Sequence, residues 1–260
     1  MSLAAPPGSS SVWPAVRMVA RADIGQQRLN NEDAVGIHPQ LQPWPAAVLA
    51  DGMGGYNAGE VASTMAVDLI AAAVQHCSDS EDSPDLVAKE LADALHMANT
   101  AIYAAAQSTP GYSGMGTTVV VALVLAREVL IAHLGDSRAY AWRAGRLQRL
   151  TRDHSLVQQD IDAGLITEAD AKTSRYGHLV TRALGVMPQV EPELSHWLLQ
   201  QGDRILLCSD GLTDMLSDAS LESLFEENLP LARLKEALIE AANAAGGKDN
   251  IGVVLIEQDA

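Results

Sequence analysis

Aromatic residues are scarce in this chain, and basic residues are outnumbered by acidic ones. Phe, Trp and Tyr make up 4% of its 260 residues, so the apolar 48% must build a core from aliphatic side chains. Lys and Arg number 17 against 33 Asp and Glu, which gives a formal net charge of -16. A surface with this charge repels phosphate backbones and anionic lipids. We therefore expect neither nucleic acid nor a membrane surface as a partner.

Cysteines and long apolar runs are also few. Cys77 and Cys208 are the two cysteines, too few for a disulfide framework and without CxxC spacing. Both lie in apolar stretches, where a free thiol packs as a small hydrophobe. The most apolar run, residues 119–126, is far shorter than the roughly 20 residues that a membrane helix needs. Residues 1–11 lack the basic start and apolar core of a signal peptide. These absences favour the cytoplasm.

The length of the chain is compatible with one large domain. Residues 1–12 are rich in Ala, Pro, Gly and Ser and predict a flexible tail, followed by a single domain over residues 13–260. Residues 151–187 are polar and partly helical in pattern, with no long strand. We expect this segment to form a flap subdomain inserted in the domain.

Hydrophobic periodicity predicts helices and strands in an order that does not fit strict βαβ alternation. Val61, Met65 and Leu69 lie on one face of a predicted helix, and we expect this face to pack in the core. A second helix follows Ser83, which can cap it. The first of these helices covers residues 59–74, and further helices are predicted over residues 221–225 and 230–245. Strands are predicted over residues 16–22, 46–50, 118–125, 129–134, 139–143, 204–209 and 251–256. Two successive helices followed by successive strands favour an α+β fold with an antiparallel sheet and helices outside it.

Four aspartates share one local pattern at the ends of predicted strands. Asp51, Asp136 and Asp210 follow apolar strands and lie beside glycine, and Asp249 precedes the last strand. A carboxylate at a strand end is held on a rigid element and still reaches solvent, which suits a ligand of Mg2+ or Mn2+. Taken alone, each Asp-Gly pair is more typical of a tight turn. Together they favour a site for a pair of divalent cations.

Seven short motifs occur along almost the whole chain. They are RLNNED at 28–33, DGMGG at 51–55, GMGTT at 114–118, GDSR at 135–138, VTRALG at 180–185, SDG at 209–211 and DN at 249–250. In this order they resemble the motifs of the metal-dependent protein phosphatases of the protein phosphatase 2C type, in their bacterial form. The resemblance implies a four-layer α-β-β-α sandwich: a central antiparallel β-sandwich flanked by helix pairs, with metals in a cleft at one end.

The resemblance also implies which residues bind Mn2+ or Mg2+. Asp51 matches the aspartate that bridges two cations, and Gly52 would lend its carbonyl to the second. Asp210 and Asp249 would complete the protein ligands of the first. Asp136 matches the ligand of a third cation in bacterial members, which it would share with Asp210.

Three residues of the first motif complete the implied site. Glu32 and Asp33 would hold metal-bound waters. Arg28 matches the arginine that grips the substrate phosphate, for which a planar guanidinium with two parallel donors is suited. A structural ion pair between Arg28 and Glu32 or Asp33 is the alternative reading of this arginine.

The implied activity is hydrolysis of phosphoserine and phosphothreonine by direct attack of a water that bridges two cations. The partners would be phosphorylated proteins, among them a cognate bacterial Ser/Thr kinase and its substrates, and the enzyme would be a monomer. Two alternatives remain: a non-catalytic regulator of the same fold that binds a kinase or phosphoprotein, and a phosphohydrolase for small molecules.

The proton donor for the leaving alkoxide is left open by the sequence. A basic alkoxide benefits from a general acid. Members of the family often have a His in or just after the DGxGG segment, where this chain has Met53 and Tyr56. A metal-bound water and His154 are the remaining candidates.

Overall fold

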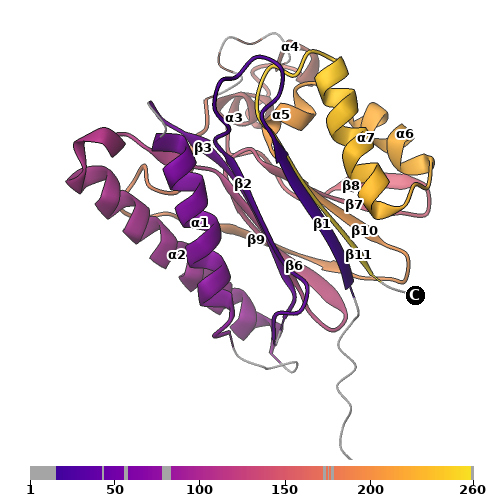
Figure 1. Ribbon diagram of the computed structural model, residues 1–260, viewed down its shortest axis with the longest axis horizontal. Coiled ribbons are helices and arrows are strands. Elements are labelled where there is room, and N and C mark those ends of the chain that lie inside the picture. Colours follow the sequence, from indigo (N-terminus) through magenta and orange to yellow (C-terminus); the bar gives the residue numbers. More distant parts are fainter. Residues whose placement is uncertain are drawn as a thin grey trace, which may run out of the picture.

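Two antiparallel β-sheets pack face to face at the centre of the computed structural model, with helices on both outer sides (Figure 1). The structure describes residues 16–42, 44–55, 58–77, 83–171, 174, 176 and 179–258. The tail predicted over residues 1–12 lies outside these residues, as does Tyr56.

Each sheet is built from strands that are far apart in the sequence. The strands of the first sheet are β1 (Val16–Asp23), β7 (Arg138–Arg143), β8 (Arg146–Arg149), β10 (Arg204–Cys208) and β11 (Ile251–Gln258). They pair in the order β1-β11-β10-β7-β8. The strands of the second sheet are β2 (Asp33–His38), β3 (Ala46–Met53), β4 (Gly116–Thr117), β5 (Val119–Val124), β6 (Glu128–Leu134) and β9 (Glu193–Leu198). They pair in the order β2-β3-β5-β6-β9, and β4 pairs with the end of β3.

The central strands are apolar at almost every position because both of their faces are buried. Along β3, Ala47 and Leu49 pack in the cluster between the two sheets, whereas Ala46 and Val48 pack against the helices. Successive side chains of a strand point to opposite faces, so a strand covered on both sides has no place for an alternating polar residue. The aliphatic core expected from the composition lies between and outside these sheets.

Helices cover the two outer faces. The second sheet carries α1 (Ala58–Val74) and α2 (Pro84–Ser108), and the first carries α5 (Asp210–Thr213), α6 (Asp218–Glu226) and α7 (Leu231–Ala244) (Figure 1). A short 3-10 helix, Pro110–Tyr112, follows α2. The α+β fold and the four-layer α-β-β-α sandwich are therefore confirmed.

The predicted inward face of α1 is wrong. Its buried stripe contains Ala62, Ala66 and Ile70, while Leu69 is 38% exposed and Val61 is only partly buried. The helix lies against both β3 and α2, and small side chains let its backbone approach both neighbours closely. The sequence pattern predicted burial of the larger apolar residues on the adjacent face of the helix. Of these, Val61 and Met65 are only partly buried, at the edge of the contact.

Three strands and one cap also differ from the prediction. The strands β2, β8 and β9 were not predicted, because each carries polar or charged residues and is only partly buried. Ser83 occupies the cap position of α2, but its side chain makes no capping hydrogen bond. Packing in the sheet, rather than local sequence preference, therefore determines these three strands.

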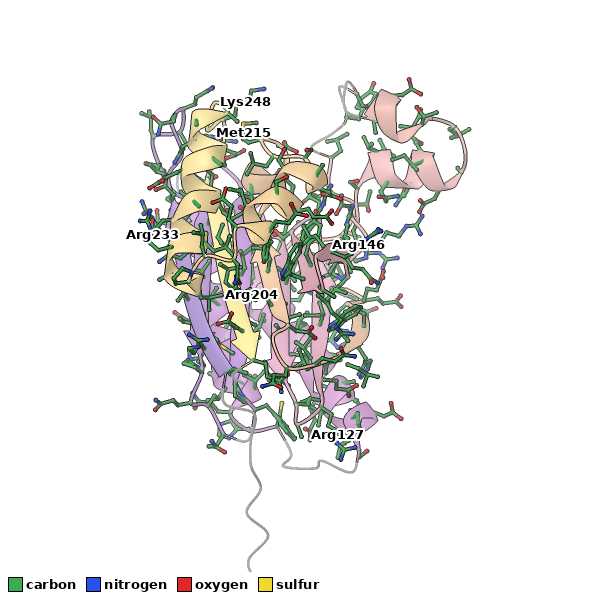
Figure 2. All side chains as sticks on the ribbon, turned by 90° about the vertical axis from the view of Figure 1, so that its right-hand side faces the viewer. Arg127, Arg146, Arg204, Met215, Arg233 and Lys248 are labelled. Atoms are coloured by element: carbon green, nitrogen blue, oxygen red, sulfur yellow. The ribbon has the colours of Figure 1, made fainter. Side chains whose placement is uncertain are left out.

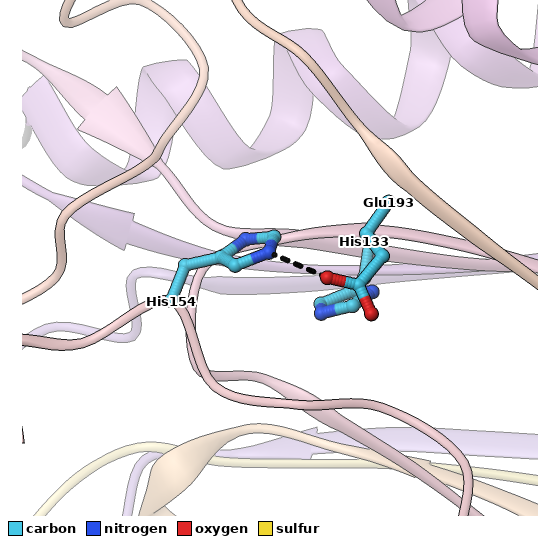
Figure 3. Close-up of side chains that lie close together, drawn as sticks. All are labelled: His133, His154 and Glu193. Carbon is cyan, nitrogen blue, oxygen red and sulfur yellow. Dashed lines mark hydrogen bonds and ion pairs between the residues drawn. The ribbon is translucent and has the colours of Figure 1, made fainter. Parts of the chain in front are cut away.

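The segment 151–187 contains α3 (Leu156–Asp162) and α4 (Glu168–Ala171). Figure 2 shows these helices projecting near the end of the sandwich at which Lys248 lies. Two histidines join the start of the segment to the second sheet: the ring of His154 stacks on that of His133, with centroids 4.6 Å apart and an interplanar angle of 8° (Figure 3).

Hydrogen bonds fix the tautomer of both rings. His133 Nε2 lies 2.8 Å from the carbonyl oxygen of Arg152, which can only accept, so this nitrogen carries a hydrogen. The backbone N–H of Gly135 donates to His154 Nδ1 at 3.2 Å, so the hydrogen of His154 is on Nε2, 3.3 Å from a carboxylate oxygen of Glu193.

This tautomer assignment argues against a cation at the His133, His154 and Glu193 cluster. Potential ligand atoms of the three side chains lie within 4.8 Å of one another. A metal between them would need a lone pair on His154 Nε2, but the lone pair of this neutral ring is already used by Gly135. We therefore interpret the cluster as a hydrogen-bonded anchor for the segment 151–187.

The anchor predicts a loss of stability in mild acid. Burial is the main cause that lowers the pKa of His133 and of His154, and each ring also feels nearby charges, including Glu193. Because the folded-state pKa values are depressed, the stabilising contribution is present above the unfolded value of about 6.5 and is lost as pH falls through the folded values.

We expect the double variant His133→Gln and His154→Asn to remove this pH dependence, since each amide retains the hydrogen bond of the ring it replaces. The free energy of unfolding of the wild type, measured by urea denaturation, should fall relative to the variant between about pH 7.5 and about pH 5.5. A difference that stays constant over this range would contradict the assignment of neutral rings.

Candidate metal centre

Asp33 and Asp51 lie opposite each other at one end of the second sheet. Asp33 begins β2 and Asp51 is near the end of β3, and the two are directly paired in the antiparallel register. Directly paired residues of neighbouring strands point to the same face of the sheet. Asp33 is buried and Asp51 is half-buried, so two carboxylates meet where the strands leave the core.

Asp210 and Asp249 come together at the corresponding end of the first sheet. Asp210 follows β10 and Asp249 precedes β11, and these strands are antiparallel neighbours. A Cβ added at Gly211 would lie 3.4 Å from Asp249 Cβ and 1.9 Å from the carbonyl oxygen of Asn250. Only glycine fits at such a close approach, which explains the Asp-Gly pair here.

The hydroxyl of Ser209 joins the two sheets at this end. It donates to Asp33 Oδ2 at 2.7 Å and accepts from the backbone N–H of Gly252 at 2.8 Å. Ser209 is fully buried. This bridge holds the carboxylate of Asp33 from the second sheet beside the aspartates of the first.

Electrostatic interactions extend over all five predicted aspartates. Burial, followed by the negative charges of the other four, raises the pKa of Asp51 well above its usual range. Burial also raises the pKa of Asp33 to about 7, against the lowering effect of its hydrogen bond from Ser209. The pKa of Asp136 rises to about 7 through burial and the charge of Asp210. The carboxylates thus lie close enough to repel one another.

A divalent cation fits this group of side chains. Oδ1 of Asp33 is buried with no hydrogen-bond partner among the described residues. An unpartnered carboxylate oxygen surrounded by further carboxylates is unfavourable unless a positive charge compensates it. Oxygen ligands of this kind are those that Mg2+ and Mn2+ prefer. The residues present therefore match the cations that the resemblance implies.

Glu32 and Gly52 lie beside the aspartates. The backbone N–H of Gly52 donates to the carbonyl oxygen of Glu32 at 3.0 Å, and a Cβ on Gly52 would lie 2.1 Å from the carbonyl oxygen of Gly59. The close contact with α1 requires glycine at this position. Burial raises the pKa of Glu32, while the charge of Arg28 lowers it.

Arg28 is half-exposed and forms an ion pair with Asp249. The alternative of a direct ion pair with Glu32 or Asp33 is not what the structure has. Arg28 lies on the loop that joins β1 to β2. Its ion pair with Asp249 thus holds the guanidinium beside the cluster of aspartates.

Threonines of the GMGTT motif hold the backbone of Asp51, a role that the sequence analysis missed. Thr117 Oγ1 donates to the carbonyl oxygen of Asp51 at 2.8 Å, and Thr118 Oγ1 accepts from its N–H at 3.2 Å. Thr118 Oγ1 is also 2.7 Å from the hydroxyl of Ser137, the neighbour of Asp136. The motif identified the two threonines, but the sequence does not show that they bond to Asp51 and Ser137, which are distant along the chain. The same motif forms the short strand β4.

His154 is poorly suited to donate a proton in the reaction. Its ring is buried, and both ring nitrogens make hydrogen bonds within the anchor described above. A general acid must reach the leaving oxygen directly or through one water. The geometry therefore disfavours His154 among the two candidates that the sequence left open.

Comparison with known proteins agrees with this geometry. The family model described as protein phosphatase 2C matches residues 24–241. The serine/threonine phosphatase stp of Listeria monocytogenes is 38% identical over 243 residues, which cover 92% of this chain and 94% of that protein. Protein phosphatase PhpP of Streptococcus pneumoniae is 38% identical over 241 residues, which cover 92% of this chain and 97% of that protein.

Solved structures give the same result. The S. agalactiae serine/threonine phosphatase has a TM-score of 0.88 at 35% identity and covers 94% of this chain and 100% of its own. The catalytic domain of the phosphatase PstP, solved in complex with 2 manganese ions, has a TM-score of 0.80 at 39% identity and covers 94% of this chain and 99% of its own. Sequence, fold and motif order together show that this chain belongs to the protein phosphatase 2C family.

Proposed function

We propose that this chain is a metal-dependent protein phosphatase that hydrolyses phosphoserine and phosphothreonine. The observation that carries the proposal is the meeting of five aspartates from both sheets at one end of the sandwich. The names of the relatives, all serine/threonine or protein phosphatases, support the substrate class. The retained acidic residues favour an enzyme over a non-catalytic regulator, because a regulator has no need to bury mutually repelling carboxylates.

The positions of the aspartates at the strand ends indicate which residues would bind the cations. Asp51, the carbonyl oxygen of Gly52, Asp210 and Asp249 would together hold a pair of cations. Asp136, whose charge interacts with that of Asp210, would help to hold a third cation. Manganese in the PstP structure supports Mn2+ or Mg2+ as the cation.

The chain's own residues orient the reactants. When bound, the cations supply the positive charge that lowers the pKa of a water and makes it a nucleophile near neutral pH. Glu32 and Asp33 would hold waters beside the cations. Arg28 binds two oxygens of the substrate phosphate, which fixes its orientation and offsets its charge. Asp249, which is paired with Arg28 in this structure, would then be a cation ligand.

The remaining expectations concern the whole protein. We propose a single catalytic domain over residues 13–260 with a flap at 151–187, acting as a cytoplasmic monomer on a cognate kinase and its substrates. No helix in the described ranges is long and apolar enough to cross a membrane. The net charge of -16 supports the absence of nucleic acid and of a membrane surface among the partners.

Replacement of Asp210 tests the metal dependence. The loss of supporting residues around a metal ligand already costs about 10- to 100-fold in affinity or activity, so Asp210→Ala should lower Mn2+-dependent hydrolysis of a phosphothreonine peptide by more than about 100-fold. Calorimetric titration with MnCl2 should show weaker binding. Asp68→Ala, on the exposed face of α1, is the matched control and should behave as the wild type. Hydrolysis that persists in the variant or after EDTA treatment would exclude the proposed mechanism.

Replacement of Arg28 tests phosphate binding. Arg28→Lys keeps the charge but loses the two parallel donors, so the KM for the phosphopeptide should rise about 10-fold, and more in Arg28→Ala. Steady-state phosphate release gives KM and kcat for each variant. Arg146→Ala, an exposed arginine on β8, serves as the control. An unchanged KM in both Arg28 variants would reject the role of this residue.

A further inference from the structure

Asn250 belongs to the last of the seven motifs, and its side chain has no part in the proposed site. The residue is 5% exposed. Its Oδ1 accepts from the backbone N–H of Glu32 at 2.8 Å, and its Nδ2 donates to the carbonyl oxygens of Ile24 at 3.0 Å and Asn30 at 2.9 Å. Carbonyl oxygens only accept and the N–H only donates, so the orientation of the carboxamide is unambiguous.

These three hydrogen bonds span one loop, which joins β1 to β2. Ile24 lies at its start, and Asn30 and Glu32 lie at its end. Arg28 lies between the anchored positions. The start of the loop has a second support, because the N–H of Gln26 donates to the carbonyl oxygen of Gly247 at 2.8 Å.

The later part of the loop depends on Asn250 more strongly. Besides these hydrogen bonds, the partly exposed ion pair of Arg28 with Asp249 links this part of the loop to the last motif. Exposed ion pairs contribute little to stability. The carboxamide of Asn250 is buried, so its hydrogen bonds are costly to leave unmade. It is thus the stronger of these two links between the loop and the last motif.

Asn250 also touches the segments that carry the aspartates. It directly follows Asp249, and its carbonyl oxygen lies against Gly211, the neighbour of Asp210. Through Glu32, whose carbonyl oxygen accepts from Gly52, its influence extends to the end of β3. One buried residue therefore contacts the loop of Arg28 and the backbone that supports the metal ligands.

We propose that Asn250 is a positioning residue that fixes the loop 24–32 and so presents Arg28 to the substrate phosphate. Its side chain binds the loop backbone alone and contacts neither phosphate nor cation. The inference rests on the proposed role of Arg28. It predicts that loss of the carboxamide weakens substrate binding while cation binding at the aspartates persists.

Amide hydrogen exchange in the metal-free protein tests the anchoring directly. In Asn250→Ala the exchange of the Glu32 amide should accelerate about 10-fold or more, because its acceptor is removed and the loop opens more often. Trypsin should also cut faster after Arg28, where the next residue, Leu29, is 93% exposed. If Asn250→Ala does not fold, Asn250→Asp takes its place, because it keeps the shape and one acceptor but loses both donors. Exchange of the Glu32 amide should accelerate in this variant too.

Kinetics and metal titration separate positioning from a general loss of structure. In Asn250→Ala the KM for a phosphothreonine peptide should rise about 10-fold, while the affinity for MnCl2 measured by calorimetry changes by less than about twofold. Asn99→Ala is the matched control: Asn99 is also a buried asparagine, bonded to Met187 and Gly185, so its loss should leave exchange at Glu32 unchanged.

Two results would overturn the inference. Unchanged exchange at Glu32 in the Asn250 variants would show that the carboxamide does not hold the loop, whatever the Arg28 variants do. A fall in Mn2+ affinity as large as the rise in KM would show that Asn250 acts through Asp249 instead. If the Arg28 variants keep the wild-type KM while exchange at Glu32 accelerates, the anchoring stands and the phosphate-binding role of Arg28 fails.

Discussion

Repulsion between buried carboxylates is the interaction on which the site depends. Asp33, Asp51 and Asp136 are pressed together with Asp210 and Asp249, and burial and mutual charge raise the pKa values of the first three. A folded chain tolerates such a group only if rigid elements hold it and positive charge compensates it. The sandwich meets the first condition with strand ends from both sheets, and divalent cations meet the second. The fold and the bound cations are therefore both needed to stabilise this cluster of carboxylates.

Small polar side chains keep this end of the sandwich in place. The hydroxyl of Ser209 links the two sheets, Thr118 links the backbone of Asp51 to Ser137, and Asn250 holds the loop of Arg28. Each is buried and donates or accepts toward atoms distant in sequence. Because such groups are costly to leave unpaired, their hydrogen bonds define a narrow set of positions for the charged residues beside them. Supporting residues of this kind determine how well a reactive geometry is maintained.

Much of the fold was predictable because most of its strands are buried on both faces. The apolar runs of β3, β5, β10 and β11 and the helix α7 stand out locally, and the structure has them close to the predicted residues. The strands β2, β8 and β9 lack such a signal, since their stability comes from pairing within the sheet. The inward face of α1 was mispredicted for a related reason. Ala62 and Ala66 are buried by the close approach of β3 and α2, a property of the neighbours and not of the helix sequence.

The sequence by itself determined the chemical inventory: the aspartates at strand ends, the glycines beside them, the arginine of the first motif and the order that identifies the family. These signals are local, because residue type and spacing along the chain are enough to read them. Only the tertiary structure decided that Arg28 pairs with Asp249, that His154 is an anchor, and that Asn250 binds the loop 24–32. Such contacts join residues separated by tens to hundreds of positions. Their formation depends on how two sheets pack, which no short stretch of sequence encodes.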